Sequence, residues 1–331
     1  MPSYVHLAYR RNAKAAARSS QIKENKNEHL LEKAREDFGY FCEYVADKPP
    51  AEHHKNWHRH FITNEDSSCL IKIAGPNIDL LAPRGSAKST VLGLLTAWAI
   101  GIHTAAKKPL QVLYLSYTVD IARSKSATIK RIIESKRYQE VFPTVRLLKN
   151  VTSNEYWSID HKFAGIDTTG EEQFTLCAAG LKGSVTSKRS HLVMIDDAIK
   201  SAADISNPDI RKQMQENWNA VIAPTMFEGG RAICLGTRFR HDDIHSTTFN
   251  EQNNWTQIVL SAILNNEKTG DEESYWPDMW SLDYLKEKKR QAPIAFSFQY
   301  MNQIVRQNEL SLAPELIVKA EISTEFDSLG I

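Results

Sequence analysis

Short apolar runs alternate with longer stretches of helical periodicity along most of the chain. The runs predict buried strands at residues 78–82, 111–117, 155–159, 174–179, 191–195 and 231–235. The longer stretches predict helices at residues 28–45, 91–105, 119–138 and 209–222. Because strands and helices of these lengths alternate, the pattern predicts an α/β fold with a mainly parallel sheet flanked by helices.

The first predicted strand ends in a loop of small residues that leads into a helix. The strand breaks at Pro83 and Gly85, and Lys88 and Ser89 open the helix. This order forms the phosphate-binding loop of nucleotide triphosphatases, in which backbone N–H groups and a helix N-terminus cradle the β- and γ-phosphates. The lysine would neutralise phosphate charge, and the serine hydroxyl would ligate Mg²⁺. The sequence therefore predicts a site for ATP and Mg²⁺ formed by Pro83, Arg84, Gly85, Ser86, Ala87, Lys88, Ser89 and Thr90.

Two positions of this loop depart from the usual pattern G-x-x-x-x-G-K-[ST]. Ala82 and Ala87 stand where glycines are usual. Alanine tolerates left-handed backbone angles poorly, so Ala87 must have a negative φ or carry strain. Two alternatives therefore stay open: a plain strand–turn–helix, and a degenerate loop in a scaffold that hydrolyses nothing.

Two aspartates, Asp196 and Asp197, follow the predicted strand 191–195. In mainly parallel sheets, ligands bind at the carboxyl ends of the strands. Asp196 would hold the metal through its water shell, since Mg²⁺ keeps several waters, and Asp197 is placed to orient or deprotonate the attacking water. The alternative for such an acidic pair is a helix cap. We expect Lys88 and Asp196 to come from two neighbouring strands and to converge on one magnesium–triphosphate.

Two further residues are candidates for the catalytic machinery. Thr237 follows the strand 231–235, where its hydroxyl could sense the γ-phosphate and shift the next segment when phosphate leaves; a plain turn is the alternative. Arg84 could stabilise charge on the transferring phosphoryl group, as an arginine finger in cis does, or pair with a surface carboxylate. Arg123 or Arg189 could serve a neighbouring subunit in trans.

The composition excludes several classes of protein. The 331 residues are 42% hydrophobic and 24% charged, as in an ordinary globular protein. The formal net charge is +1, so the overall charge does not indicate binding to nucleic acid or to a membrane surface. The longest apolar stretch, 91–102, is too short to span a bilayer. His54 and His58 share one face of a predicted amphipathic helix, which alone is a weak metal signal. The absence of any C-x-x-C pair argues against a zinc site or a disulfide scaffold; the cysteines are Cys42, Cys69, Cys177 and Cys234.

The two ends of the chain differ from the rest. Residues 1–27 carry six basic side chains against one acidic one, so we expect a basic, disordered arm that could touch DNA phosphates or an acidic partner. A single domain is expected at 28–305, with a helical lead-in at 28–62, followed by a tail at 306–331.

Residues 82–90 resemble the arginine-containing Walker A loop of large terminase subunits, the DNA-packaging motors of tailed bacteriophages. Residues 192–197 are similar to the Walker B strand of that family, which a basic glycine loop precedes, here 182–189. Residues 235–238 resemble the coupling motif, and 279–282 with 296–303 resemble the end of the motor domain. The likeness spans about residues 50–303.

The resemblance implies a P-loop NTPase core of the ASCE (RecA-like) type that uses ATP and Mg²⁺ to translocate double-stranded DNA into a procapsid. It also implies a homo-oligomeric ring on the portal protein, a small terminase subunit as partner, and a place in the host cell cytoplasm. Family members often carry a glutamate at or after the Walker B aspartates, and here Asp197 is the best candidate for the catalytic base.

A departure from the family lies at the C-terminus. Full-length relatives carry a nuclease after the motor, and only about 28 residues follow Gln303. We therefore expect a motor half without DNA cleavage. The alternative function is that of another nucleic-acid-stimulated ATPase, such as a helicase. A helicase would require a D-E-x-H or D-E-A-D Walker B strand and paired RecA-like domains.

Overall fold

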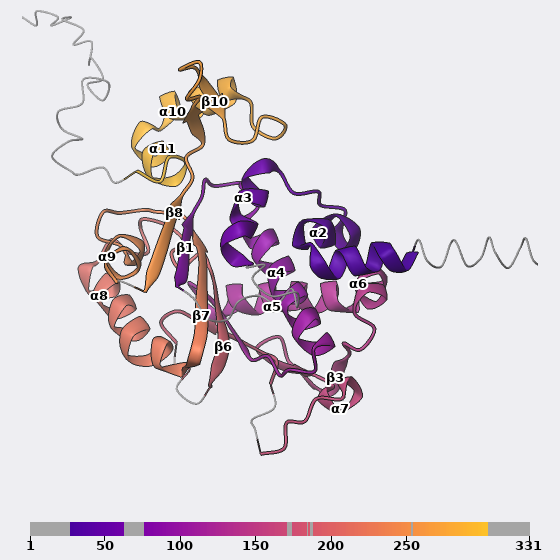
Figure 1. Cartoon of the computed structure of the whole chain (residues 1–331). Helices are drawn as coiled ribbons and strands as arrows, with labels where there is room; N and C mark the ends of the chain where they lie inside the picture. The colour runs from indigo at the N-terminus through magenta and orange to yellow at the C-terminus, as the bar shows by residue number, and fades with distance from the viewer. Residues whose placement is uncertain are drawn as a thin grey trace, which may run out of the picture.

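An eight-stranded sheet forms the centre of the molecule (Figure 1). The computed structural model describes residues 27–62, 76–170, 174–183, 185, 188–252 and 254–303. The strand order is β3-β4-β5-β2-β6-β7-β1-β8, and every pair from β5 to β8 is parallel, whereas β3–β4 and β4–β5 are antiparallel. The strands are β1 (Asn77–Leu81), β2 (Val112–Ser116), β3 (Leu147–Thr152), β4 (Tyr156–Ile159), β5 (Leu176–Gly180), β6 (Ser190–Asp196), β7 (Met226–Gly236) and β8 (Trp255–Val259). The predicted fold class, a mainly parallel sheet flanked by helices, is confirmed.

Helices cover both faces of this sheet (Figure 1). On one face lie α2 (Phe38–Ala46), α3 (Glu52–Phe61), α4 (Lys88–Ala105), α5 (Val119–Glu134) and α6 (Lys136–Val141); on the other lie α8 (Pro208–Asn217) and α9 (Ile244–Glu251). The short elements α7 (His161–Ala164), η1 (Trp218–Ile222) and η2 (Ala223–Thr225) complete the connections. Because both faces are covered, β1, β2 and β5 are buried along their whole length, which explains their continuous apolar runs. In the part of the chain that the structure describes, no helix is both long and apolar enough to cross a bilayer.

Two of the predicted helices are each divided in two by a capping residue. The helix expected at 28–45 breaks at Asp37, whose carboxylate accepts a hydrogen bond from the N–H of Tyr40 and begins α2. The helix expected at 119–138 breaks at Ser135, whose hydroxyl accepts from the N–H of Tyr138 and begins α6. Asp and Ser satisfy the free N–H groups of a new helix in this way, so a polar residue within a helical pattern can end one helix and start another.

The order of the strands corrects one expectation. β7 pairs with both β6 and β1, so the strands that precede Asp196 and Lys88 are not neighbours. The carboxyl end of β7, at Gly236, lies between them, which places Thr237 between the phosphate loop and the aspartates. Sequence order could not reveal this, because parallel neighbours are joined by long crossovers and need not be consecutive.

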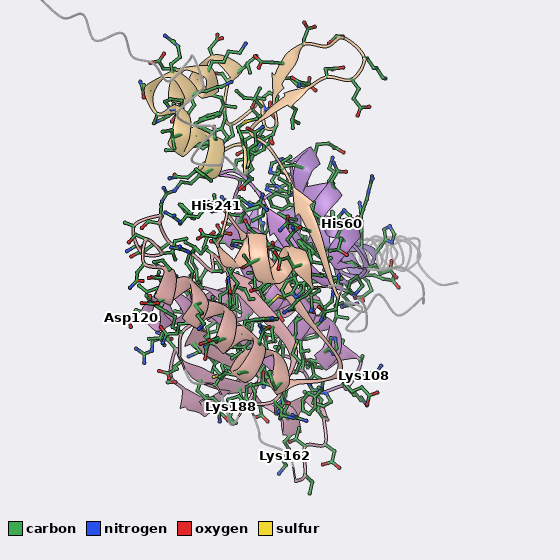
Figure 2. The ribbon with its side chains drawn as sticks, turned by 90° about the vertical axis from the view of Figure 1, so that its left-hand side faces the viewer. His60, Lys108, Asp120, Lys162, Lys188 and His241 are labelled. Carbon is green, nitrogen blue, oxygen red and sulfur yellow. The ribbon has the colours of Figure 1, made fainter. Side chains whose placement is uncertain are left out.

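Residues 261–303, here called the C-terminal unit, stand at one end of the sheet (Figure 1). The unit contains β9 (Ile263–Asn265), β10 (Glu272–Ser274), α10 (Leu282–Gln291) and α11 (Pro293–Gln299), around a small core of its own. Figure 2 shows His241, which follows β7, near this unit and Lys188, which precedes β6, toward the opposite end. The carboxyl ends of the central strands therefore face the C-terminal unit. Of the predicted arm, 1–27, only the last residue is described, and the predicted tail, 306–331, lies outside the described residues.

Two glycines of α4 give a matched test of its packing. A Cβ at Gly101 would fall far inside van der Waals contact with the Phe142 ring, whereas a Cβ at Gly93 would meet only a methylene of Ile129 at 3.9 Å. We expect Gly101→Ala to lower the free energy of unfolding by about 1–3 kcal/mol through overpacking. Gly93→Ala should raise it by about 0.5–1 kcal/mol, since alanine favours helix. Urea unfolding measures the free energy of unfolding of both variants. A change of the same sign and size in the two would contradict this packing.

A buried histidine of α4 predicts a loss of stability in acid. His103 is 3% exposed, and neither ring nitrogen has a hydrogen-bond partner within the described residues. Burial, with smaller contributions from His191 and Lys108, lowers the pKa of His103 to about 4. In the unfolded chain the pKa of His103 is near 6.5, so the unfolded chain binds the proton at a higher pH than the folded protein does. The contribution of neutral His103 to stability is therefore fully present above about pH 6.5 and is lost as the pH falls toward 4. When the pH falls from 7 to 5, the unfolding free energy of the His103→Gln variant should decrease by about 2 kcal/mol less than that of wild type. Equal decreases would contradict the lowered pKa of His103.

Candidate active site

The loop between β1 and α4 has the backbone that the sequence pattern requires. Gly85 has φ 82°, and Ala87, which directly precedes α4, has φ 61° and ψ 21°. Of the two predicted alternatives for Ala87, the strained one is therefore realised. The left-handed conformation costs an alanine about 1–2 kcal/mol, and the contacts of the loop with its surroundings must offset this strain.

The ammonium group of Lys88 lies inside this loop. It donates hydrogen bonds to the carbonyl oxygens of Ala82 at 2.9 Å and Pro83 at 3.0 Å, and the residue is only 7% exposed. Burial lowers the pKa of Lys88, and the charges of Asp197 and Asp196 oppose that shift. Two carbonyl acceptors and two nearby carboxylates thus hold a desolvated cation inside the loop.

Ser89 and Asp196 meet at the carboxyl end of β6. The Ser89 hydroxyl donates to Oδ1 of Asp196 at 2.7 Å, and the Tyr114 hydroxyl donates to Oδ2 at 3.2 Å. Lys125 Nζ lies 3.6 Å from the same Oδ2. Burial and then the charge of Asp197 raise the pKa of Asp196, whereas Lys125, Ser89 and Tyr114 act to lower it.

Tyr114 and Lys125 were not singled out from the sequence. Tyr114 lies two residues before the end of β2 and reaches Asp196 because β2 pairs with β6, which the sequence does not reveal. Lys125 is one residue of the helix predicted at 119–138, with no neighbouring motif that marks it. Its contact with Asp196 depends on the packing of α5 over the sheet, which no local pattern encodes.

Asp197 follows β6 in a left-handed conformation, with φ 50°. Its N–H donates to the carbonyl of Leu235 on β7 at 3.0 Å, which anchors the turn. Its Oδ1 is buried and has no hydrogen-bond partner among the described residues. The alternative that the acidic pair caps a helix is wrong, since the next helix, α8, begins at Pro208 and is capped by Asn207. A buried carboxylate oxygen without a partner is costly unless a ligand or water satisfies it.

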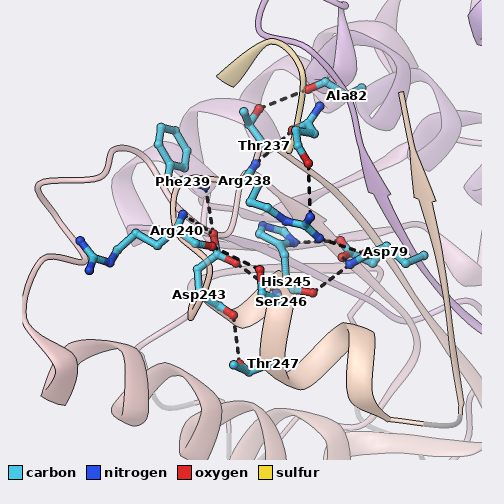
Figure 3. Close-up of polar contacts among 12 residues, drawn as sticks. Asp79, Ala82, Thr237, Arg238, Phe239, Arg240, Asp243, His245, Ser246 and Thr247 are labelled. Atoms are coloured by element: carbon cyan, nitrogen blue, oxygen red, sulfur yellow. Dashed lines mark hydrogen bonds and ion pairs between the residues drawn. The ribbon is translucent and has the colours of Figure 1, made fainter. Parts of the chain in front are cut away.

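Thr237 reaches the phosphate loop from the end of β7. Its hydroxyl donates to the carbonyl of Ala82 at 3.4 Å, the same oxygen that Lys88 contacts, and Thr237 is 4% exposed (Figure 3). Thr237 is therefore a buried residue that contacts the phosphate loop, at the end of β7.

Arg238, the next residue, connects this strand end to two other segments. Its guanidinium donates to the carbonyl of Asn302 at 3.2 Å and to Oε1 of Gln257 at 3.0 Å. Gln257 in turn donates to Asp79 at 2.9 Å, and the other oxygen of Asp79 lies 2.9 Å from Nδ1 of His245 (Figure 3). A buried polar network therefore lies beneath Thr237, and sequence reasoning missed it because its members come from five separate segments of the chain.

Arg84 contacts the C-terminal unit and pairs with no carboxylate among the described residues. Its N–H and its guanidinium donate to the main-chain and side-chain oxygens of Gln299, both at 3.0 Å. Within the part of the chain that the structure describes, the alternative of a surface ion pair for Arg84 is not realised. Of the two arginines proposed to act in trans, Arg123 pairs with Glu155 and Asp120. The other, Arg189, donates to the Pro224 carbonyl at 3.2 Å.

A cavity of about 230 Å³ opens over this loop. It brings together seven of the eight predicted loop residues with both Asp197 and Thr237, whereas Pro83 does not line it and Asp196 lies behind Ser89. Ile199, Lys200 and Phe239 line the cavity as well and were not predicted. The lining residues are Arg84, Gly85, Ser86, Ala87, Lys88, Ser89, Thr90, Asp197, Ile199, Lys200, Thr237 and Phe239.

The donor set fits a magnesium–triphosphate. A hydroxyl and a carboxylate 2.7 Å apart supply the hard oxygen ligands that Mg²⁺ prefers. The buried Lys88 ammonium and the start of α4 supply positive charge for phosphate oxygens. Asp197 lines the same cavity, which places a carboxylate beside the loop, and its buried Oδ1 has no hydrogen-bond partner among the described residues.

The fold has counterparts among solved structures. The ATPase domain of the large terminase from Thermus phage P74-26 is similar with a TM-score of 0.50 and 14% identity, over 80% of this chain and 97% of that domain. The bacteriophage HK97 large terminase gives a TM-score of 0.42 and 14% identity over 70% of this chain, which spans 47% of that protein. Neither models of protein families nor curated protein sequences give a match. The chain thus shares its fold with the ATPase domain of the P74-26 large terminase, as the predicted resemblance implies.

Proposed function

We propose that this chain is an ATPase of the large terminase type, which hydrolyses ATP to drive double-stranded DNA into a viral procapsid. The observation that carries the proposal is one cavity lined by Lys88, Ser89, Asp197 and Thr237, with Asp196 hydrogen-bonded behind Ser89. These groups come from the carboxyl ends of β1, β6 and β7 and the start of α4, which is where open α/β sheets bind ligands.

Each residue has a distinct task in this proposal. The loop from Arg84 to Thr90 binds the phosphates, with Lys88 as the main counter-charge. Ser89 and Asp196 would hold Mg²⁺, which supplies charge neutralisation at the phosphate oxygens when it is bound.

Three residues face the reacting end of the triphosphate. Asp197 orients and deprotonates the attacking water, and Thr237 senses whether the γ-phosphate is present. Arg84, released from Gln299, stabilises charge on the transferring phosphoryl group.

The motor role rests on the fold and on the order of the motifs. A terminase ATPase of this kind takes double-stranded DNA as its track, the portal protein and a small terminase subunit as partners, and a homo-oligomeric ring as its working form in the host cytoplasm. The shared fold with the ATPase domain of the P74-26 large terminase supports this proposal.

Phosphate release from ATP by the purified protein tests the proposal. We expect turnover with Mg²⁺, none in EDTA, and stimulation when linear double-stranded DNA and portal are added together; protein carrying Lys88→Ala is the blank. Turnover that DNA and an isolated portal leave unchanged would favour an ATPase without a packaging role. Turnover equal to the blank would favour a degenerate, non-hydrolysing scaffold and overturn the proposal.

A further inference from the structure

His54 of α3 lies against the outer side of the phosphate loop. Its Nε2 lies 3.0 Å from the carbonyl oxygen of Ser86, and its Nδ1 lies 3.2 Å from the backbone nitrogen of Ala51. The backbone N–H of Ala51 can only donate, so Nδ1 is the acceptor and carries no proton. Nε2 therefore carries the proton and donates it to Ser86. Burial lowers the pKa of His54, which favours this neutral tautomer.

We propose that His54 is a positioning residue of the phosphate loop, which holds the Ser86–Ala87 peptide so that the Ala87 N–H faces the phosphates. In a trans peptide the C=O and the next N–H point in opposite directions. A carbonyl held toward α3 thus turns the N–H of Ala87 the other way, and Ala87 lines the cavity. This inference rests on the proposed function, since it assigns a task in binding the same nucleotide.

The ring of His54 is fixed from both sides. It packs against Trp57 of its own helix, at 5.1 Å between ring centroids, and against Trp276 of the C-terminal unit, at 5.2 Å. His54 is only 6% exposed. A donor on a ring held by two indoles has little freedom, so its hydrogen bond to Ser86 fixes the direction of one peptide.

The conformation of Ala87 explains why such a residue is needed. A non-glycine residue with φ 61° persists only where the surroundings determine it. The hydrogen bond from His54 acts on the peptide directly before Ala87, and the first turn of α4 acts on the residues after it. With glycine at position 87 the left-handed conformation is free of strain. The contribution of His54 to nucleotide binding should therefore depend on which residue occupies position 87.

A double-mutant cycle on nucleotide affinity tests this coupling. The full chain is titrated with a fluorescent ATP analogue and Mg²⁺, as wild type, His54→Phe, Ala87→Gly and the double variant. Phenylalanine keeps the ring but removes the donor, so we expect a Kd about tenfold weaker than wild type, and less than about threefold weaker in the Ala87→Gly background. His54→Gln keeps an N–H donor and should bind within about threefold of wild type.

Controls separate positioning from a general loss of structure. His58→Ala changes another histidine of α3, whose ring packs on Phe38, and should leave the Kd unchanged. Thermal unfolding without nucleotide verifies each fold; should His54→Phe unfold, His54→Met replaces it in the same cycle. Equal Kd for wild type and the donor-less variant, or the same loss in both backgrounds, would overturn the inference. Wild type that binds no nucleotide would instead overturn the proposed function.

Discussion

Replacement of Lys88 by alanine is expected to lower the rate of ATP hydrolysis by about 10³-fold, the largest effect of any single substitution in this chain. The ammonium is the cation buried most deeply in the loop cavity, and two carbonyl oxygens already hold it in position. Because Lys88 is buried, its charge acts in a site of low dielectric and attracts phosphate oxygens more strongly than it would in water. The variant also leaves the carbonyls of Ala82 and Pro83 without this donor, so nucleotide binding should weaken together with turnover.

Single-turnover hydrolysis and nucleotide titration measure the two effects separately. Lys88→Arg keeps the charge but not the compact shape of the ammonium, and should recover little activity. Lys212→Ala is the matched control, since Lys212 lies on α8 with an exposed side chain paired to Glu216. A Lys88→Ala rate within about fivefold of wild type would show that the loop is not the reaction site.

The sequence predicted the central strands well because their environment is uniform. β1, β2 and β6 lie between two layers of helices, so nearly every side chain is buried and each strand is a continuous apolar run. β8 was not predicted, because its environment is not uniformly apolar. It lies at the edge of the sheet, its residues from Thr256 onward are partly or fully exposed, and the run is interrupted by Gln257.

The candidate site was predictable to the extent that its residues follow strands. Asp196 and Thr237 lie at or just after the end of an apolar run, and Lys88 follows the loop that ends β1; parallel strands bring such positions to one edge. The order of those strands was not predictable, which is why β7 was not expected between β1 and β6. Pairing partners in this sheet lie up to 178 residues apart, as Asp79 and Gln257 do, and local patterns carry no information about them.

The residues that support the phosphate loop could not be predicted from the sequence either, for a related reason. His54 and Gln299 contact the phosphate loop from α3 and α11, on opposite sides of it in the chain. Each is one polar residue in a helix whose pattern shows only which face is apolar. Their contacts follow from how the helices dock, and docking depends on the whole core.

Substitution of Asp197 by asparagine is expected to reduce kcat by about 10²-fold while the nucleotide Kd changes less than about threefold. Asparagine adopts the left-handed conformation readily, so the φ of 50° and the hydrogen bond from its N–H to Leu235 should persist. What is lost is the negative charge of a carboxylate that lines the cavity and whose Oδ1 has no partner among the described residues. Binding should survive, because Lys88 and Ser89 remain.

Asp196→Asn separates the roles of the two aspartates. Asp196 accepts from Ser89 and Tyr114 and lies beside Lys125, so its loss should raise the concentration of Mg²⁺ needed for half-maximal nucleotide binding. Asp197→Asn should leave that concentration unchanged and lower only the rate of the chemical step in single-turnover hydrolysis. If Asp197→Asn keeps the wild-type rate, another carboxylate activates the water. If both variants shift the Mg²⁺ dependence alike, the two aspartates hold the metal together, and the assignment of Asp197 as the base is wrong.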